Sequence, residues 1–415
     1  PTPDPTAPAP GPPPGAKPST PHHAPTYTTP TTTDPNRPRP TPTPRPSEIA
    51  CPLSGPERYP ANRRGCVGQD AGVSNRLELS RHSTIVGGHS GQVPVALSVG
   101  PADDLIVLWT SSQDAAAVHG QTTVPGWASF PDPAPDAPVA ARVSMYRPDG
   151  IDEIALSALP VSHPTLQPMP NGHVLVVGAR AQWRPDDPDR NALLFGPDGD
   201  VVASATFGDG IEHVFATTVG DVWVGYFDEG VYGNYGWGGP GPTPIGACGL
   251  IQFGVDLAPE WTFPSHVNER WGAISDCYAL NVTDEATWAC YYTDFPIVKM
   301  QESDISWWAN AVGGARALVT DGARVALVGG YGSDHSRVEI ASLHTDTAMT
   351  FASGRLCLPG GAEVPEGAQM FGRGPELHVV VGDVWYRISL DRLVSAATKR
   401  RSWWRKNESD GSPPR

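Results

Sequence analysis

Short apolar runs recur along the chain from about residue 76, and each is bounded by Gly, Pro, Asn or Asp. Runs of this kind, rich in Val, Ile and aromatic residues, predict β-strands that are separated by turns. The pattern therefore predicts an all-β fold for most of the chain.

The runs form a repeat in which an apolar run, a tight polar turn and a second apolar run occur six times. The six pairs are 93–99 with 105–109, 165–169 with 173–177, 213–218 with 222–226, 277–282 with 287–291, 315–320 with 323–328, and 377–381 with 384–388. Outer hairpins lie between the pairs, for example at Pro148-Asp149-Gly150. Two hairpins per period make a four-stranded antiparallel sheet, and repeated sheets of this size are typical of a β-propeller, where each blade is buried between its neighbours.

Over about residues 76–395 the chain resembles the broad β-propeller superfamily of quinoprotein-like and kelch- or WD-like repeats. The resemblance rests on the hairpin repeat, because the Trp-Asp signature of WD repeats is absent and the kelch glycine doublet is not regular. We expect six blades, with seven as the alternative. The last pair leaves its blade one or two strands short, so we expect residues 76–79 to supply the missing outer strand and close the ring.

Composition divides the chain into further segments. Of the 47 prolines, 18 lie within residues 1–47, where they alternate with Thr, Ala and Gly. Such a segment has too little apolar surface to offset its ordering entropy, so we expect residues 1–50 to form a disordered, extended Pro/Thr-rich linker. Residues 51–75 are expected to be an irregular lead-in, and residues 396–415 a disordered basic tail. An arm of this type favours a secreted or surface-exposed protein.

Charge argues against one class of partner. The body, residues 51–398, holds 19 basic and 39 acidic side chains, whereas the formal charge of the whole chain is −15. A body this acidic repels phosphate backbones, so we expect no nucleic acid to bind it. No uninterrupted apolar stretch is long enough to span a bilayer. We expect a monomer that begins at Pro1 as a processed product or a fragment.

Six cysteines are too few for a disulfide scaffold in a chain of this length. Cys51 and Cys66 flank the start of the folded region and are candidates for a pair. Cys277 and Cys290 lie on neighbouring predicted strands, and for them we favour two buried thiols over a cross-strand disulfide.

Propeller topology predicts where a ligand binds. The loops that follow the second strand of each blade all emerge on one face, and five of them, at 110–141, 180–191, 227–247, 293–296 and 329–337, are the longest and most decorated in the chain. We expect a ligand on this long-loop face, because the turns of the opposite face are short.

The loop at 225–246 combines carboxylates, amides and aromatic rings with glycine and proline, which suits the binding of sugars or peptides. The alternative is that its rings pack against one another inside the propeller. The candidate binding residues are Tyr226, Asp228, Glu229, Tyr232, Asn234, Tyr235 and Trp237 in this loop, with Trp183, Asp294 and Asp334 in neighbouring loops.

Carboxylates recur at similar places in these loops, among them Asp186, Asp228, Asp294 and Asp334. If they met at the channel mouth, they would hold Ca²⁺ or act as an acid/base pair, but a solvated acidic rim is the interpretation that we favour. We expect no cofactor, with Ca²⁺ as the alternative. His213 and Arg316 occupy matching positions of two blades and are candidates for lining the channel, although structural hydrogen bonding is the role that we favour for both.

Motifs of nucleophilic, zinc and dinucleotide chemistry are absent from the sequence. We therefore expect a non-catalytic recognition module that binds a protein or glycan on the long-loop face. The alternative is a propeller hydrolase or lyase with a Ca²⁺ ion or a carboxylate pair at the channel mouth. A scaffold that docks in a larger assembly is the third possibility.

Overall fold

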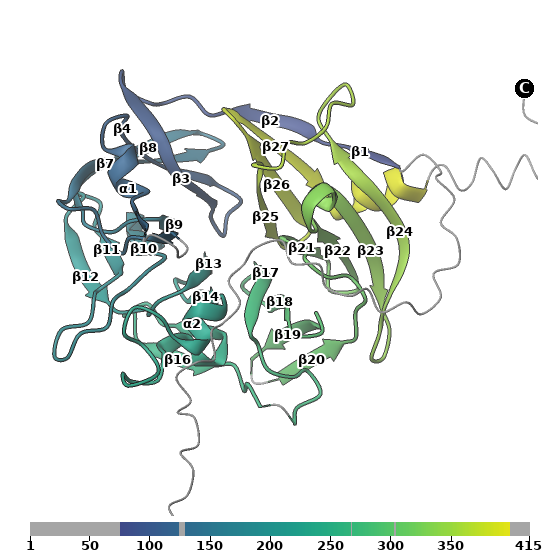
Figure 1. Cartoon of the computed structure of the whole chain (residues 1–415). Coiled ribbons are helices and arrows are strands. Elements are labelled where there is room, and N and C mark those ends of the chain that lie inside the picture. The colour runs from purple at the N-terminus through teal and green to yellow at the C-terminus, as the bar shows by residue number, and fades with distance from the viewer. Residues whose placement is uncertain (1–74, 124–128, 267, 303, 399–415) are drawn as a thin grey trace, which may run out of the picture. The chain divides into compact units, whose positions relative to one another are not determined.

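The computed structural model describes residues 75–123, 129–266, 268–302 and 304–398. The described residues form a six-bladed β-propeller of four-stranded antiparallel sheets (Figure 1). This confirms the predicted fold class and decides for six blades over seven. The predicted linker at 1–50, the lead-in at 51–75 except Asn75, and the basic tail from 399 onward lie outside the described residues.

The first three blades follow one another along the chain, each running from the channel outward. Blade one consists of β3 (Gln92–Val99), β4 (Leu105–Ser111), β7 (Val139–Arg147) and β8 (Gly150–Leu159). Blade two consists of β9 (Pro164–Pro168), β10 (Val174–Gly178), β11 (Ala192–Phe195) and β12 (Val201–Ala205). Blade three consists of β13 (Ile211–Ala216), β14 (Val222–Tyr226), β15 (Leu250–Phe253) and β16 (Pro259–Thr262).

The last three blades continue in the same order. Blade four consists of β17 (Asp276–Val282), β18 (Thr287–Tyr292), β19 (Ile297–Gln301) and β20 (Asp304–Trp308). Blade five consists of β21 (Ala317–Thr320), β22 (Arg324–Val328), β23 (Arg337–Leu343) and β24 (Ala348–Cys357). Blade six consists of β25 (Gln369–Arg373), β26 (Glu376–Val381), β27 (Val384–Ser389) and β2 (Ser80–Thr84).

The ring is closed by two segments from the N-terminal side of the propeller, which lie beside the last blades in Figure 1. Strand β2 pairs antiparallel with β27 and completes blade six, so the prediction of an N-terminal closing strand is confirmed but its residues are corrected. Residues 76–79 do not fill this place. Instead β1 (Arg76–Glu78) pairs in parallel with β24 and adds a fifth strand to blade five.

The core lies between the blades rather than within any one of them. In β10, Val174 and Val176 pack into the cluster shared with blade one, whereas Leu175 and Val177 pack into the cluster shared with blade three. Alternate side chains of a strand point to opposite faces of its sheet, so a strand that is covered on both faces must be apolar at every position. This burial explains why the sequence shows continuous apolar runs.

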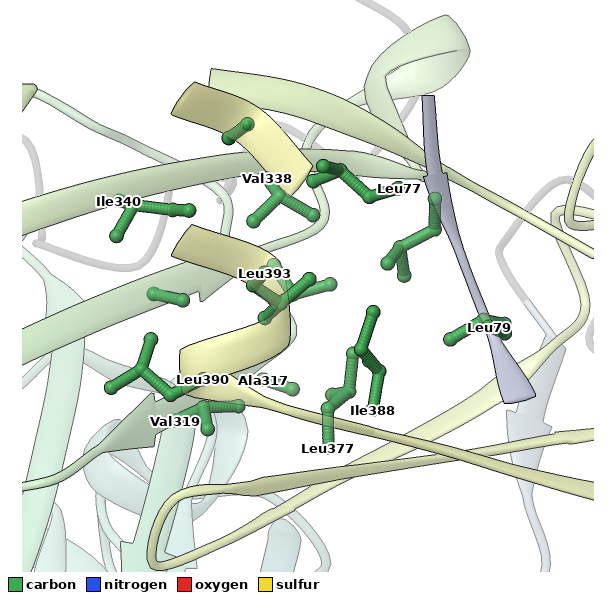
Figure 2. Packing of buried hydrophobic residues seen from close by; sticks show 14 of the residues in the cluster. Leu77, Leu79, Ala317, Val319, Val338, Ile340, Leu377, Ile388, Leu390 and Leu393 are labelled. Carbon is green, nitrogen blue, oxygen red and sulfur yellow. The ribbon is translucent and has the colours of Figure 1, made fainter. Parts of the chain in front are cut away.

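The chain ends, as far as it is described, in a helix at residues 390–398. Its Leu390, Leu393 and Ala397 are buried in the cluster between blades five and six, and Figure 2 shows Leu393 near Val338 and Leu77. The predicted tail therefore starts later than residue 396. No helix among the described residues is long and apolar enough to cross a membrane.

The remaining short elements lie in the loops between the blade strands. They are α1 (Ala115–Val118), the hairpin β5 (Gln121–Thr123) and β6 (Ser129–Pro131), the 3₁₀ turns η1 (Pro170–Gly172), η2 (Ile245–Cys248) and η3 (Gly332–Asp334), and α2 (Asp228–Tyr232). All of these except η1 lie in the connections between the second and third strands of blades one, three and five, on the predicted long-loop face. In blade six the same connection is only the turn at Gly382-Asp383.

Candidate functional site: a one-ended central channel

A cavity of about 720 Å³ occupies the axis of the propeller. The first strand of every blade, or the residue that enters it, contributes to the wall. One lining residue from each blade is Val95, Thr165, His213, Tyr278, Arg316 and Gln369 in chain order. Because these residues lie toward the beginnings of the inner strands, the cavity opens on the long-loop face. His213 and Arg316, which were candidates for lining the channel, both belong to its wall.

Arg373 at the end of β25 closes the other end of the channel. Its Nη1 donates to the carbonyl oxygens of Ala216 and Val282, at 2.9 and 3.1 Å. Its Nη2 donates to Val99 O at 2.8 Å and to Gln167 Oε1 at 2.6 Å. The guanidinium thus joins blade six to blades one, two, three and four.

No carboxylate among the described residues makes a hydrogen bond or an ion pair with Arg373. The guanidinium carbon lies 4.5 Å from the centre of the Phe215 ring, and the residue is 4% exposed. Burial lowers the pKa of Arg373 to about 9, so the side chain stays charged at neutral pH. Backbone carbonyls and one amide oxygen therefore take the place of water around this cation.

Two amide side chains lie beside Arg373 at the closed end of the channel. Gln167 donates to Ser98 Oγ at 2.6 Å, and its oxygen also accepts from the Ala216 N–H at 3.0 Å. Asn281 donates to the carbonyls of Leu318 and Gly374, at 2.8 and 3.0 Å. Together with Arg373 these residues connect all six blades at one end of the axis.

β-Bulges shape the open end. The inner strands of blades one, three and four each carry one, at Val95, Glu212 and Tyr278 respectively. All three bulged residues line the cavity. A bulge inserts an extra residue into a strand and redirects its side chain, which is why bulges are frequent beside binding sites.

Two carboxyl groups line the wall near the mouth, Glu212 on β13 and Asp276 on β17. Within the part of the chain that the structure describes, neither carboxyl makes a hydrogen bond or an ion pair. Burial, together with the negative charges of Glu212 and Asp228, raises the pKa of Asp276 to about 7. The site therefore holds a carboxyl group that titrates near neutral pH beside a second carboxylate.

Neutral polar groups complete this wall. Burial lowers the pKa of His213, whose enclosed Nε2 has no hydrogen-bond partner among the described residues. Tyr278 accepts a hydrogen bond from the hydroxyl of Tyr331 at 3.0 Å, and burial raises the pKa of its phenol. At neutral pH the imidazole and the phenol are therefore uncharged.

Most of the predicted residues of the 225–246 loop are used to hold that loop in place. Tyr226 is fully buried and donates to Phe207 O at 2.6 Å, and the buried Trp237 donates to Ala181 O at 2.8 Å. These two side chains present little surface to a ligand. The alternative that rings of this loop pack inside the propeller describes them well.

Arg180 anchors the same loop from below. It forms two 2.8 Å hydrogen bonds to Asp209 and a 2.5 Å ion pair with Glu229, and it lies 4.6 Å below the centre of the Tyr235 ring. Asn234 donates to Glu229 at 2.9 Å. Burial raises the pKa of Asp209 to about 6. Glu229, Asn234 and Tyr235 are thus engaged with Arg180 or with one another.

The other predicted residues belong to several different loops, except that Asp228 and Tyr232 share α2. Tyr232 is 68% exposed and shares a 2.7 Å hydrogen bond with Ser275, and Asp228 is exposed at the start of α2. Asp294 is exposed, and Asp334 pairs with Arg355 at 2.5 Å. Trp183 is half-buried, and its backbone N–H donates to the backbone carbonyl of Tyr235 in the 225–246 loop. Ligand binding by these residues stays a prediction.

For these carboxylates a solvated acidic rim was the favoured interpretation and a Ca²⁺ site the alternative. Among the described residues, no group of three or more His, Cys, Asp or Glu side chains is arranged to hold a metal ion. Glu212 and Asp276, which sequence reasoning missed, are the carboxylates that reach the cavity. Each directly precedes the apolar run of an inner strand, at 213–218 and 277–282, and this shared position was the available signal.

The cysteines inside the described chain are all thiols. Cys277 and Cys290 lie on the paired strands β17 and β18, and burial raises the pKa of both. This agrees with the favoured interpretation of two buried thiols. The candidate pair Cys51 and Cys66 falls outside the described residues.

Replacing Asp276 with asparagine should stabilise the protein in alkaline solution. An unfolded chain ionises this carboxyl near pH 4, whereas the folded protein keeps it protonated to about pH 7. The folded state therefore binds more protons between these values, and its stability falls as the pH rises through them. We expect the variant to gain about 1–2 kcal/mol in unfolding free energy at pH 8, a value reduced for the partial exposure of the carboxyl, and nothing at pH 4.

Urea unfolding of both proteins at pH 4 and pH 8 measures this difference. Asp187→Asn, at an exposed carboxyl with no hydrogen bond or ion pair among the described residues, is the matched control and should show the same stability as the parent at both values. A gain at pH 8 that Asp187→Asn shares would contradict the assignment to Asp276.

Comparisons with known proteins show little similarity beyond the fold. Residues 265–317, which contain blade four, match the YxzG family, and this is less than half of the chain. No curated protein sequence matches. The luciferin-regenerating enzyme is 11% identical, with 76% of this chain and 94% of that chain covered and a TM-score of 0.38.

Two further solved structures are similarly distant. A catalytically inactive virginiamycin B lyase from Staphylococcus aureus, solved with quinupristin, is 11% identical, with 74% of this chain and 98% of that chain covered and a TM-score of 0.34. The Cps50 (Swd1) β-propeller domain from Myceliophteria thermophila is 12% identical, with 60% and 84% covered and a TM-score of 0.34. These scores carry no argument about function.

Proposed function

We propose that this propeller is a recognition module that takes its ligand into the mouth of the central channel. The observation that carries the proposal is the cavity of about 720 Å³, closed by Arg373 at one end and lined near the other by the unpartnered carboxyl groups of Glu212 and Asp276. Glu212 is exposed and Asp276 is partly exposed, and neither has a partner among the described residues, so both carboxyl groups are accessible to a ligand.

The lining suits a ligand that carries both flat apolar surface and hydrogen-bonding groups. Phe227, Phe371 and Tyr278 provide rings, and Thr165 and Gln369 provide polar atoms. Glycans and protein side chains both have this character. The size of the cavity lies within the range of small-molecule sites, so the recognised part is a sugar unit or a compact side chain.

A screen of glycans and peptides against the full chain tests the proposal. Binding is detected by thermal shift and measured by calorimetry, and Gln369→Trp is used to fill the cavity from its wall. We expect Gln369→Trp to weaken binding at least about tenfold, because the indole occupies the ligand's place. Gln301→Trp, at the exposed last residue of β19, is the matched control and should bind as the parent does. Equal binding by both variants would place the ligand elsewhere and overturn the proposal.

The second candidate function is a hydrolase or lyase, and the position of Asp276 favours it. A carboxyl group that titrates near pH 7 beside a second carboxylate is the arrangement that acid/base catalysts use. The same experiment separates the two functions when each bound compound is recovered and analysed by mass spectrometry. Intact compound supports recognition, whereas a product that Asp276→Asn fails to form supports the enzyme.

A further inference from the structure

The walls of the channel are charged unevenly. The two carboxyl groups without partners come from adjacent inner strands, and Asp228 adds a third negative charge near the mouth, as its effect on Asp276 shows. Two arginines belong to the cavity region. The donors of Arg373 are engaged with backbone carbonyls at the closed end of the channel. Arg316 on blade five is the arginine that lines the wall. A ligand group that enters between blades three and four therefore meets negative charge.

A bare metal ion does not suit this wall. No group of three acidic, histidine or cysteine side chains among the described residues could hold one. An organic cation needs fewer and less closely spaced oxygens, because its ammonium hydrogens reach individual carboxylates. The Tyr278 ring beside them adds a face toward which a cation is attracted.

The bulges show that this arrangement is built into the strands. Glu212 and Tyr278 are the bulged residues of the neighbouring strands β13 and β17, and both line the cavity. Tyr278 receives its hydrogen bond from Tyr331, so its own O–H remains available as a donor. One carboxylate and one hydroxyl donor thus line the cavity from two neighbouring blades, which suits a ligand that carries both an ammonium and a hydroxyl group.

We propose that the group recognised in the channel is an amino sugar with a free amine, whose ammonium is held by Glu212 and Asp276 and whose hydroxyl groups bind Tyr278, Thr165 and Gln369. This inference rests on the proposed recognition function and narrows it to one ligand class. The cavity is several times larger than a lysine side chain needs, and this favours a sugar ring over a side chain of a protein partner.

The experiment compares glucosamine and its short β-linked oligomers with their N-acetylated and their glucose counterparts. Binding to the full chain is measured by calorimetry at pH 7. We expect the free amine to bind about ten- to a hundredfold more tightly than either neutral counterpart, because only the ammonium forms charge-assisted bonds to the two carboxylates. Glu212→Gln and Asp276→Asn should each remove most of this preference. Glu366→Gln, at an exposed carboxylate on the same face, should leave it unchanged.

The outcomes separate this inference from the proposed function. Equal binding of amine and neutral sugars, with loss in Gln369→Trp, would overturn the amino-sugar inference and keep the recognition function. Binding of a lysine peptide but of no sugar would also overturn it, since the partner would then be a protein. If no sugar or peptide binds, both proposals fall.

Discussion

Replacing Arg373 with methionine is expected to lower the free energy of unfolding by about 3–5 kcal/mol. The methionine fills a similar volume but donates no hydrogen bond. The carbonyl oxygens of Val99, Ala216 and Val282 then lose a donor, as does the amide oxygen of Gln167. A buried acceptor without its partner costs about 1–3 kcal/mol, and water entering from the channel offsets part of the sum.

Urea denaturation of the two proteins gives this difference directly. Arg373→Lys keeps the positive charge but cannot span four acceptors with one ammonium group, so an intermediate loss is expected. The matched control is Arg270→Met, at an exposed arginine on the loop after blade three, which should change stability by less than about 0.5 kcal/mol. A loss for Arg373→Met as small as that of the control would contradict the role of Arg373 in joining the blades at the closed end of the channel.

Arg373 also shows where sequence-based prediction of the fold reached its limit. The pair 377–381 and 384–388 was interpreted as the inner hairpin of the last blade, yet these residues form β26 and β27, the second and third strands. The inner strand is β25, whose sequence, Gln-Met-Phe-Gly-Arg, lacks an apolar run because one end faces the cavity and the other carries the buried cation. A strand that lines a polar channel loses the signal by which strands are predicted.

The first five pairs were correct for the converse reason. Their second strands are buried on both faces between blades, so burial makes nearly every position of these strands apolar, and Gly, Asn and Asp mark the turns. Blade number and closure followed from counting these pairs. The closing strand was predicted at 76–79, four residues before its actual start at Ser80. The sequence does not separate the two strands, because β1 and β2 are both short and, apart from Leu77, mostly polar.

The candidate site was less predictable than the fold. Composition drew attention to the 225–246 loop, but carboxylates and rings serve equally well to hold a loop to a buried arginine as to bind a ligand. Glu212 reaches the cavity through a β-bulge, which depends on backbone pairing and leaves no mark in the sequence. The face that carries the site was nevertheless predicted, since propeller topology alone determines it.

Replacing Arg180 with methionine is the second change with a large expected effect, again about 3–5 kcal/mol of unfolding free energy. The side chain is 2% exposed, and its removal takes two hydrogen bonds from the carboxyl of Asp209, which is also 2% exposed and keeps only the bond from the Ala181 N–H. Breaking a buried ion pair from one side costs more than the pair itself contributes, because a desolvated charge remains. The double variant Arg180→Met/Asp209→Leu should therefore recover part of the loss.

Arg184→Met is the matched control, since this arginine lies four residues further along and pairs with Asp189 at the surface. An exposed pair of this kind contributes at most about 1 kcal/mol. Equal losses in the two variants, measured by urea unfolding, would contradict the anchoring role of Arg180. The expected functional consequence is specific as well: Arg180 fixes Glu229 within α2, and α2 places Asp228 near the channel mouth. The folded fraction of Arg180→Met should therefore bind its ligand more weakly than the parent does, because the loop that carries Asp228 is no longer held in place.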